Sequence, residues 1–145
     1  MTAPFWLILT LVSGHADAPQ LAAYADSAGV PPVVVFAGAW QESRSGERRN
    51  AYRGREGERG RMQLHPRGRW RRVLYGNPRC TLLRVTKYYA DNVYCACTYL
   101  RSLYNEAPSW ERAIERYNGS GRYARAYRER ALAYIGRLAL ETLPP

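Results

Sequence analysis

Apolar residues recur at helical spacing along most of the chain, and this pattern predicts a mainly α-helical protein. In residues 82–103 they return every three or four positions as one stripe, and residues 127–138 repeat that spacing. Asp91 and Asn92 could divide the first stripe into two helices, with Asp91 as the N-cap of the second. A shorter helix is expected after Ser109, whose side chain suits an N-cap.

Residues 33–43 are apolar around the whole helical circumference as far as Gln41, which predicts a central, buried helix. Pro31 and Pro32 can begin this helix because proline is tolerated in a first helical turn. The β-branched start would also suit a strand, but the length of the run favours a helix. Before it, the alanine-rich residues 21–28 predict a short helix that ends at Gly29.

Residues 44–72 differ from both of these regions. They are rich in Arg, Gly and Glu and show little periodicity, apart from a short apolar piece, Met62-Gln63-Leu64. This composition predicts loops rather than helices. With 145 residues, of which 46% are hydrophobic, the chain can form one core but not two ordinary domains. We therefore expect one helical domain with an irregular, arginine-rich loop region after its central helix.

The N-terminus resembles a cleavable signal peptide. An apolar run at residues 5–12 precedes Ala16-Asp17-Ala18, a small-x-small cleavage pattern. This predicts a leader over residues 1–18 and a mature domain over residues 19–145 that removal of the leader leaves intact. The run is too short to span a bilayer as a helix, so no stable membrane insertion is expected. No basic residue precedes it, and the alternative is a first helix of the domain itself.

The charge pattern narrows the partners without choosing among them. Twenty-two basic residues oppose 12 acidic ones, giving a formal net charge of +10, and Lys87 is the only lysine. Such a chain suits an anionic partner: nucleic acid, a membrane surface or an acidic wall polymer. Cys80, Cys95 and Cys97 lack the paired spacing of a zinc site, so we expect no metal and no cofactor. In an exported protein, Cys80 could pair with either of the other two.

Glu42 is the candidate for acid–base chemistry. It ends the most apolar helix, and at about 100° per residue it shares a face with Gly38 and Ala39, whose small side chains leave room beside a carboxyl. A carboxyl at the rim of an apolar core has a raised pKa, and the negative end of a helix acts in the same direction. A general acid needs such a pKa near neutral pH. From this stretch alone, a structural ion pair with an arginine is the alternative.

Four short segments carry characteristic residue combinations in order: residues 39–43 (AWQES), residues 57–64 (GERGRMQL) followed by Pro66, Asn92-Val93 with Tyr99-Leu100, and Ala113 with Tyr117-Asn118-Gly119. They resemble the Glu-Ser, Gly-Leu-Met-Gln, Asn-Ile to Tyr-Leu and Tyr-Asn-x-Gly motifs of the soluble lytic transglycosylase domain, in the goose-type lysozyme-like superfamily. The resemblance covers residues 21–138. Among the departures, Arg61 stands where the family usually has Leu, and Glu58 where it has a small residue.

The resemblance implies a lysozyme-like helical fold and cleavage of peptidoglycan. The family's single Glu, here Glu42, protonates the bond between N-acetylmuramic acid and N-acetylglucosamine. It then acts as base toward the muramyl 6-hydroxyl, which closes a 1,6-anhydro ring. Matched by motif, the residues expected to bind substrate or shape its site are Ser43, Met62, Gln63, Tyr99, Tyr117 and Asn118. Ser43 could instead cap the end of its helix.

Two alternatives remain open at this stage. A goose-type lysozyme would hydrolyse the same bond with a second acidic residue, for which Glu47, Glu56 and Glu58 are candidates. A nucleic-acid-binding protein would explain the interleaved Arg and Tyr but not four motifs in order. We therefore expect a monomer that binds peptidoglycan glycan strands, and anionic wall polymers through its arginines, and not nucleic acid. It would be exported to the periplasm or cell wall, or be associated with a phage.

Overall fold

The structure is a computed structural model that describes residues 10, 12–44 and 53–141, and within these ranges it contains helices and no strand. Its helices are α2 (Ala18–Ala28), α3 (Pro32–Ser43), α4 (Trp70–Val73), α5 (Leu82–Lys87), α6 (Tyr89–Glu106), α7 (Trp110–Asn118) and α8 (Arg122–Glu141). Two isolated bridges, Arg53 with Arg59 and Arg59 with Leu64, tie together the loop over residues 53–64. The mainly α prediction is confirmed.

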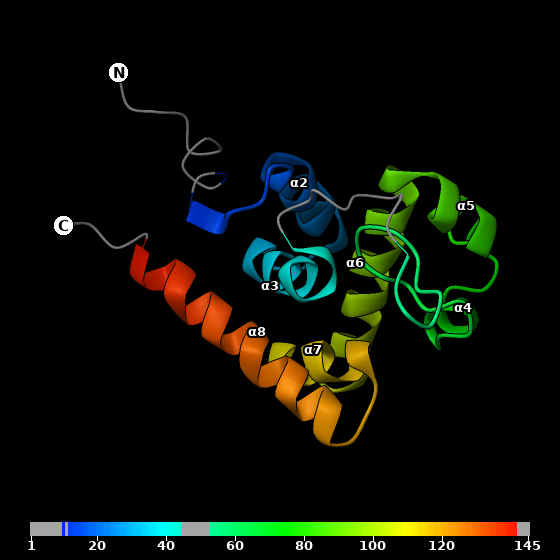
Figure 1. Ribbon diagram of the computed structural model, residues 1–145. Coiled ribbons are helices and arrows are strands. Elements are labelled where there is room, and N and C mark those ends of the chain that lie inside the picture. The colour runs from blue at the N-terminus through cyan, green and yellow to red at the C-terminus, as the bar shows by residue number, and fades with distance from the viewer. Residues whose placement is uncertain (1–9, 11, 45–52, 142–145) are drawn as a thin grey trace.

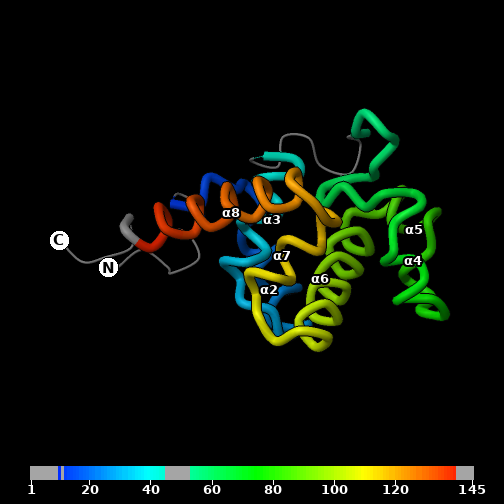
Figure 2. The backbone as a smooth tube through the Cα atoms, turned by 90° about the horizontal axis from the view of Figure 1, so that it is seen from below, coloured from blue at the N-terminus to red at the C-terminus, as the bar shows by residue number. Residues whose placement is uncertain are grey.

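Helix α3 has the central place that its apolar sequence predicts. It packs against α2, α7 and α8, while the long helix α6 packs against α2, α4, α5 and α7 (Figure 1). In α3, the residues from Val34 to Ala39 are all buried. This agrees with a helix that is apolar on every side. Figure 2 shows residues 53–69, which precede α4, lying beside α6.

The capping residues explain where the shorter helices begin and end. Gly29 follows α2 with φ 69°, a left-handed conformation that favours glycine, as the sequence predicts. Ser109 caps α7 by accepting a hydrogen bond from the backbone N–H of Arg112, also as predicted. Proline opens α2 and α3, where a missing N–H costs no helical hydrogen bond.

The expected break in the stripe over residues 82–103 is real, but its predicted place is wrong. The chain turns at Tyr88, which has extended backbone between α5 and α6. Asp91 is not an N-cap: it lies buried in the first turn of α6 and accepts hydrogen bonds from Arg79 and Arg84 at 2.7 and 2.8 Å. An acidic side chain that finds two guanidinium partners has no need of backbone donors, and spacing alone cannot show those partners.

The cysteines and the helix lengths complete the fold. Cys80 and Cys95 form a disulfide between the loop before α5 and helix α6. Cys97 is buried on its own, and burial raises the pKa of its thiol to about 12. None of the helices in the described ranges has the length and apolar character needed to cross a bilayer.

Residues 13–17 are part of the packed domain. His15 and Asp17 are buried, and the Tyr134 hydroxyl of α8 donates to the carbonyl of Ser13 at 2.7 Å. A cut after Ala18 would remove these contacts, whereas the sequence alone predicts that the domain stays intact without residues 1–18. The leader itself stays a prediction, because residues 1–9 and 11 lie outside the described residues.

Candidate active site

A cleft of about 400 Å³ lies where the segment between α3 and α4 meets α6 and α7. It is bounded by the end of α3, the start of α4, and residues of α6 and α7 that face them. Its lining residues are Glu42, Arg55, Glu56, Glu58, Gln63, Leu64, His65, Gly68, Arg69, Trp70, Tyr99, Tyr117 and Asn118. The cleft therefore contains most of the residues that the motifs single out.

Glu42 lines this cleft, and its carboxyl has a strongly raised pKa. The residue as a whole keeps partial exposure because it lines the cleft, but its carboxyl group lies among buried side chains. Burial raises the pKa of Glu42 to about 8; the Tyr127 hydroxyl opposes this rise, and the negative charge of Glu58 adds to it. Glu42 is therefore protonated at neutral pH, which is the state of a general acid.

Two tyrosines lie beside the Glu42 carboxyl. Burial and the nearby charge of Glu42 hold the pKa values of Tyr117 and Tyr127 well above the ordinary value, so both stay neutral phenols. Tyr117 donates its hydroxyl to the carbonyl of Met62 at 2.7 Å. The Tyr127 hydroxyl is buried and makes no well-aligned hydrogen bond among the described residues. It is nevertheless close enough to Glu42 to stabilise the carboxylate and so to lower the pKa of Glu42.

Tyr127 has no predicted role in the site. It falls in the apolar stripe of α8, where an aromatic residue at helical spacing normally indicates core packing. The expectation that small residues leave open space beside Glu42 also changes. A Cβ on Gly38 would lie 3.6 Å from Met62 Cε and 3.9 Å from the Tyr127 hydroxyl, so these two side chains cover that face.

The loop opposite α3 brings Glu58 and Gln63 to the cleft. A Cβ on Gly54 would collide with a Glu58 carboxylate oxygen and with the Gln63 side-chain oxygen, so a larger residue there would push the ends of both side chains aside. Glu58 accepts a hydrogen bond from the backbone N–H of Glu56 at 3.1 Å. Gln63 has φ 47°, a left-handed conformation rare outside glycine, and its side-chain amide donates to the carbonyl of Gly60 at 2.7 Å.

The predicted site residues divide into two groups. Those that line the cleft are Glu42, Gln63, Tyr99, Tyr117 and Asn118. Ser43 and Met62 do not line it: their side chains are 1% and 0% exposed. Direct contact with a sugar, expected from the motifs, is therefore incompatible with their positions, and both support the cleft from behind. Glu47 lies outside the described residues.

Asn92 holds the loop against α6 and was matched as part of a motif without a role. Its side-chain oxygen accepts a hydrogen bond from the backbone N–H of Met62 at 2.8 Å. Its amide donates to the carbonyls of Arg59 and Val85 at 2.8 and 3.0 Å. All of these bonds are made by a fully buried side chain, so Asn92 determines where Met62 and the neighbouring Gln63 lie.

The family model described as the transglycosylase SLT domain matches residues 20–134. The chain belongs to this family. An SLT domain is a lysozyme-like helical domain of the lytic transglycosylase type, so the predicted fold and family are confirmed. SLT domains act on peptidoglycan, which lies outside the cytoplasmic membrane. No curated protein and no solved structure gave a significant match.

Nothing in the described part of this SLT domain resembles a metal centre, since no three His, Cys, Asp or Glu side chains lie together there. Its cleft combines a carboxyl of raised pKa with polar side chains and aromatic rings. Trp70, at the cleft wall, is 2% exposed and donates its indole N–H to the carbonyl of His65 at 2.8 Å.

Proposed function

We propose that this SLT domain is a peptidoglycan lytic transglycosylase that cleaves the β-1,4 bond between N-acetylmuramic acid and N-acetylglucosamine and forms 1,6-anhydro-N-acetylmuramic acid. Glu42 is the general acid and base. The single observation that carries this proposal is a carboxyl with a pKa of about 8 in the cleft of a domain from a peptidoglycan-acting family.

Glu42 has two tasks in this reaction. As the protonated acid it gives its proton to the glycosidic oxygen, and the bond from that oxygen to the anomeric carbon breaks. As the carboxylate it then takes the proton of the muramyl 6-hydroxyl, whose oxygen bonds to the anomeric carbon and closes the ring. The proton returns to Glu42 and no water is consumed, so one carboxyl is enough where most glycosidases need two.

Substrate contacts come from the side chains that line the cleft. Gln63 and Asn118 supply amide groups for the hydroxyl and acetamido groups of the sugars, and Tyr99 and Tyr117 supply ring surface. The Tyr117 hydroxyl is bound to the Met62 carbonyl, so this residue acts through its ring and by holding the loop. Behind the cleft, Ser43 and Met62 keep Glu42 and Gln63 in place.

The setting that fits this activity is the periplasm or cell wall, or a phage particle that breaches the wall. Export by residues 1–18 is one route. The Cys80–Cys95 disulfide supports an oxidising compartment, because disulfides are rare where thiols are kept reduced. The chain acts as a monomer on peptidoglycan strands, and exposed arginines hold it on anionic wall polymers.

Hydrolysis of the same bond is the second candidate, because Glu58 lies in the cleft and influences the pKa of Glu42. In that reaction Glu58 or Glu56 would place a water molecule for attack on the anomeric carbon. Glu58 accepts a backbone hydrogen bond from Glu56 and closes over Gly54, so its position is also explained by the loop alone.

Mass spectrometry of digested peptidoglycan separates these candidates. A transglycosylase gives products that lack one water and have no reducing end, whereas a hydrolase gives reducing sugars. We expect anhydro products from the wild type and, from Glu42→Gln, a rate lower by about 10²- to 10⁴-fold, as for loss of a general acid. Glu111→Gln, at an exposed position of α7, is the matched control and should keep full activity. An active Glu42→Gln would refute the assignment.

A further inference from the structure

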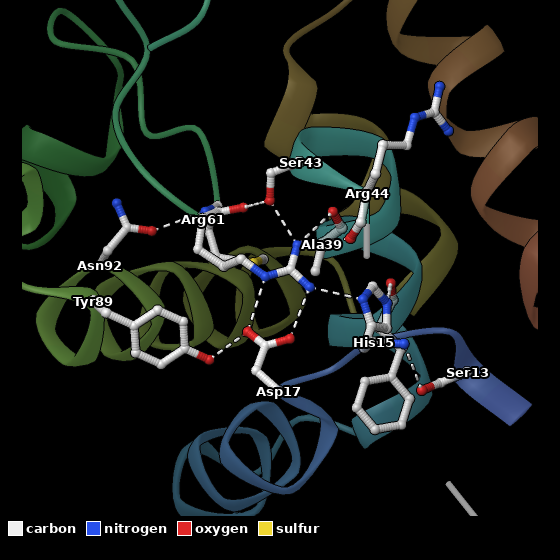
Figure 3. A network of polar contacts seen from close by, with 11 residues as sticks. Ser13, His15, Asp17, Ala39, Ser43, Arg44, Arg61, Tyr89 and Asn92 are labelled. Atoms are coloured by element: carbon white, nitrogen blue, oxygen red, sulfur yellow. Dashed lines mark hydrogen bonds and ion pairs between the residues drawn. The ribbon is translucent and has the colours of Figure 1, made fainter. Parts of the chain in front are cut away.

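Arg61 stands where the family usually has an apolar Leu, and its guanidinium is fully buried. It lies behind the C-terminal end of α3 and is surrounded by acceptors (Figure 3). A guanidinium carries five N–H donors and cannot lose its charge, so a buried one must find an acceptor in each direction. The acceptors of the Arg61 guanidinium therefore identify the segments that Arg61 holds in place.

On one side, Arg61 binds the last turn of α3. A single guanidinium nitrogen, Nη1, donates to the Ala39 carbonyl at 3.1 Å, the Ser43 hydroxyl at 2.6 Å and the Arg44 carbonyl at 2.9 Å. Carbonyls at the end of a helix lack partners within the helix, and a cation placed there is favoured by the helix dipole. These three contacts enclose the turn that carries Glu42.

On the other side, Arg61 binds the segment before α2. Its Nε and Nη2 donate to the two carboxylate oxygens of Asp17 at 2.9 and 3.0 Å. Nη2 also donates to His15 Nδ1 at 2.7 Å, which leaves Nε2–H of a neutral His15 to donate to the Phe36 carbonyl at 2.8 Å. Tyr89 of α6 donates its hydroxyl to Asp17 at 2.6 Å. Arg61 is thus held by α3 and by the segment before α2, whose Asp17 is bound in turn by Tyr89 of α6.

Backbone strain at two positions shows why such an anchor is needed. Arg44, directly after α3, has φ 63°, and Gln63, two residues after Arg61, has φ 47°. A residue other than glycine adopts this region only where its surroundings hold it there. Arg61 binds the Arg44 carbonyl, and its own carbonyl accepts the Ser43 hydroxyl, so it connects the end of α3 to the loop that carries Gln63.

We propose that Arg61, together with its counter-group Asp17, is a positioning residue that holds the Glu42 turn of α3 and the Gln63 loop in the geometry that catalysis requires. Arg61 does not touch substrate, because its side chain lies behind α3 and outside the cleft. It acts through the helix end. This inference rests on the proposed function of Glu42 and adds to it a support that lies partly in residues 13–17.

Arg61→Lys and Asp17→Asn test the proposal. Lys keeps the charge but replaces a planar fork by a single ammonium, and Asn keeps the shape of Asp17 but removes its charge. Displacement of a catalytic group by about 1 Å costs on the order of 100-fold, so we expect kcat to fall at least about tenfold in each variant. KM on soluble, uncrosslinked glycan strands should change by less than about threefold.

The pH profile gives a readout that loss of folded protein alone would not move. A loosened α3 end lets water reach the Glu42 carboxyl, so its pKa falls toward the ordinary value and the alkaline limb of the rate profile moves to lower pH. The other groups that face this carboxyl, Tyr117, Tyr127 and Glu58, are unchanged in both variants. Titration of the Glu42 carboxyl carbon by NMR follows the same pKa without turnover.

Asp91→Asn is the matched control. Asp91 is as buried as Asp17 and also binds guanidinium groups, those of Arg79 and Arg84, but it lies in α6 away from the end of α3. Rates are compared per folded molecule, measured by circular dichroism. We expect Asp91→Asn to lower stability and to leave kcat and the pH profile unchanged.

Unchanged kcat and an unchanged Glu42 pKa in Asp17→Asn would overturn the proposal, as would equal effects of Asp17→Asn and Asp91→Asn. If Arg61→Lys does not fold, Ser43→Ala, which removes one of the three contacts to the α3 turn, should show a smaller shift in the same direction, and no shift would count against the proposal. A wild type that cleaves no glycan would refute the proposed function, while the NMR titration would still decide the role of Arg61.

Discussion

Two carboxyl groups near the end of α3 have opposite surroundings. Burial raises the pKa of Asp17, but the charge and hydrogen bonds of Arg61, with the Tyr89 hydroxyl, outweigh burial and hold that pKa below its ordinary value. Glu42 has no ion pair among the described residues, and burial raises its pKa to about 8. Burial is thus common to both sites, and the counter-charge with its hydrogen bonds separates a structural carboxylate from a candidate acid.

Removal of Asp17 and His15 together should cause the largest change in stability at these two carboxyl sites. A chain that begins at Pro19 leaves Arg61 as a buried charge without its carboxylate. We expect its free energy of unfolding to be lower by about 3–5 kcal/mol, the usual cost of breaking a buried ion pair by removing one partner. The comparison is with a chain that begins at Thr10, by urea unfolding at pH 7. Equal stabilities of the two chains would show that the ion pair between Asp17 and Arg61 contributes nothing to the fold.

Glu42→Gln should show the reverse behaviour, a gain in stability that depends on pH. The folded-state pKa of Glu42, about 8, lies above the unfolded value near 4.5, so between these values the folded state binds more protons than the unfolded state. Stability of the wild type therefore falls as pH rises through this window, and Gln removes the loss. We expect Glu42→Gln to be more stable at pH 8, by about 2 kcal/mol after discounting for partial exposure, and equally stable at pH 4.

Thermal unfolding of both proteins across pH 4 to 8 measures this difference. Glu111→Gln, an exposed change on α7, should show no such trend. A constant difference between Glu42→Gln and the wild type at every pH would mean that the carboxyl titrates normally, and the distinction from Asp17 would disappear.

Glu58→Gln and Tyr127→Phe should move the Glu42 pKa in opposite directions. The charge of Glu58 raises that pKa, so Gln should lower it and shift the alkaline limb of the activity profile to lower pH. The Tyr127 hydroxyl lowers the pKa, so Phe should raise it and shift the limb to higher pH. Both variants should stay active if a single carboxyl suffices. Shifts of the same sign, or none, would contradict the surroundings assigned to Glu42.

The apolar periodicity predicted the longer helices, but it missed α4, which begins at Trp70 inside the range 44–72 whose composition predicts loops. The motif order placed Glu42, Gln63 and Tyr117 together, and all three line one cleft. Apolar spacing is a local feature of the sequence, and the motifs follow the order that the family shares. The break at Tyr88 was misplaced because Asp91 is satisfied by Arg79 and Arg84, and neither partner is evident from spacing. Side-chain partners across the fold are the information that the pattern lacks.

The same limit explains the residues that were missed. Arg61 contacts Asp17 across 44 positions of sequence, and Tyr127 approaches Glu42 from a different helix. The replacement of the family's usual Leu by Arg61 was visible in the sequence, but neither its burial nor a partner was predicted from it. Only the fold shows that the partner lies in the segment that also resembles the end of a leader.

The smallest effects should come from arginines outside both carboxyl sites. Next to the cleft lies a shallow pocket of about 760 Å³ lined by Arg67, Gly68, Arg69, Arg71, Arg72 and Tyr75, and it shares Gly68 and Arg69 with the cleft. These guanidinium groups are exposed, so salt screens them over about 8–10 Å, whereas it hardly reaches Arg61. They should raise the rate of encounter with an anionic wall rather than the rate of cleavage.

A double change, Arg67→Gln with Arg72→Gln, should therefore lower activity on whole walls by about two- to fivefold at low salt and leave little difference at high salt. The rate of cleavage of short soluble glycan fragments, which carry few charges, should change much less. The same charge change at Arg112 and Arg125, which are exposed and line neither pocket, is the control for net charge. If both pairs lower activity equally, the overall charge steers the enzyme; if only the first does, the basic pocket beside the cleft is part of the path by which a glycan strand reaches Glu42.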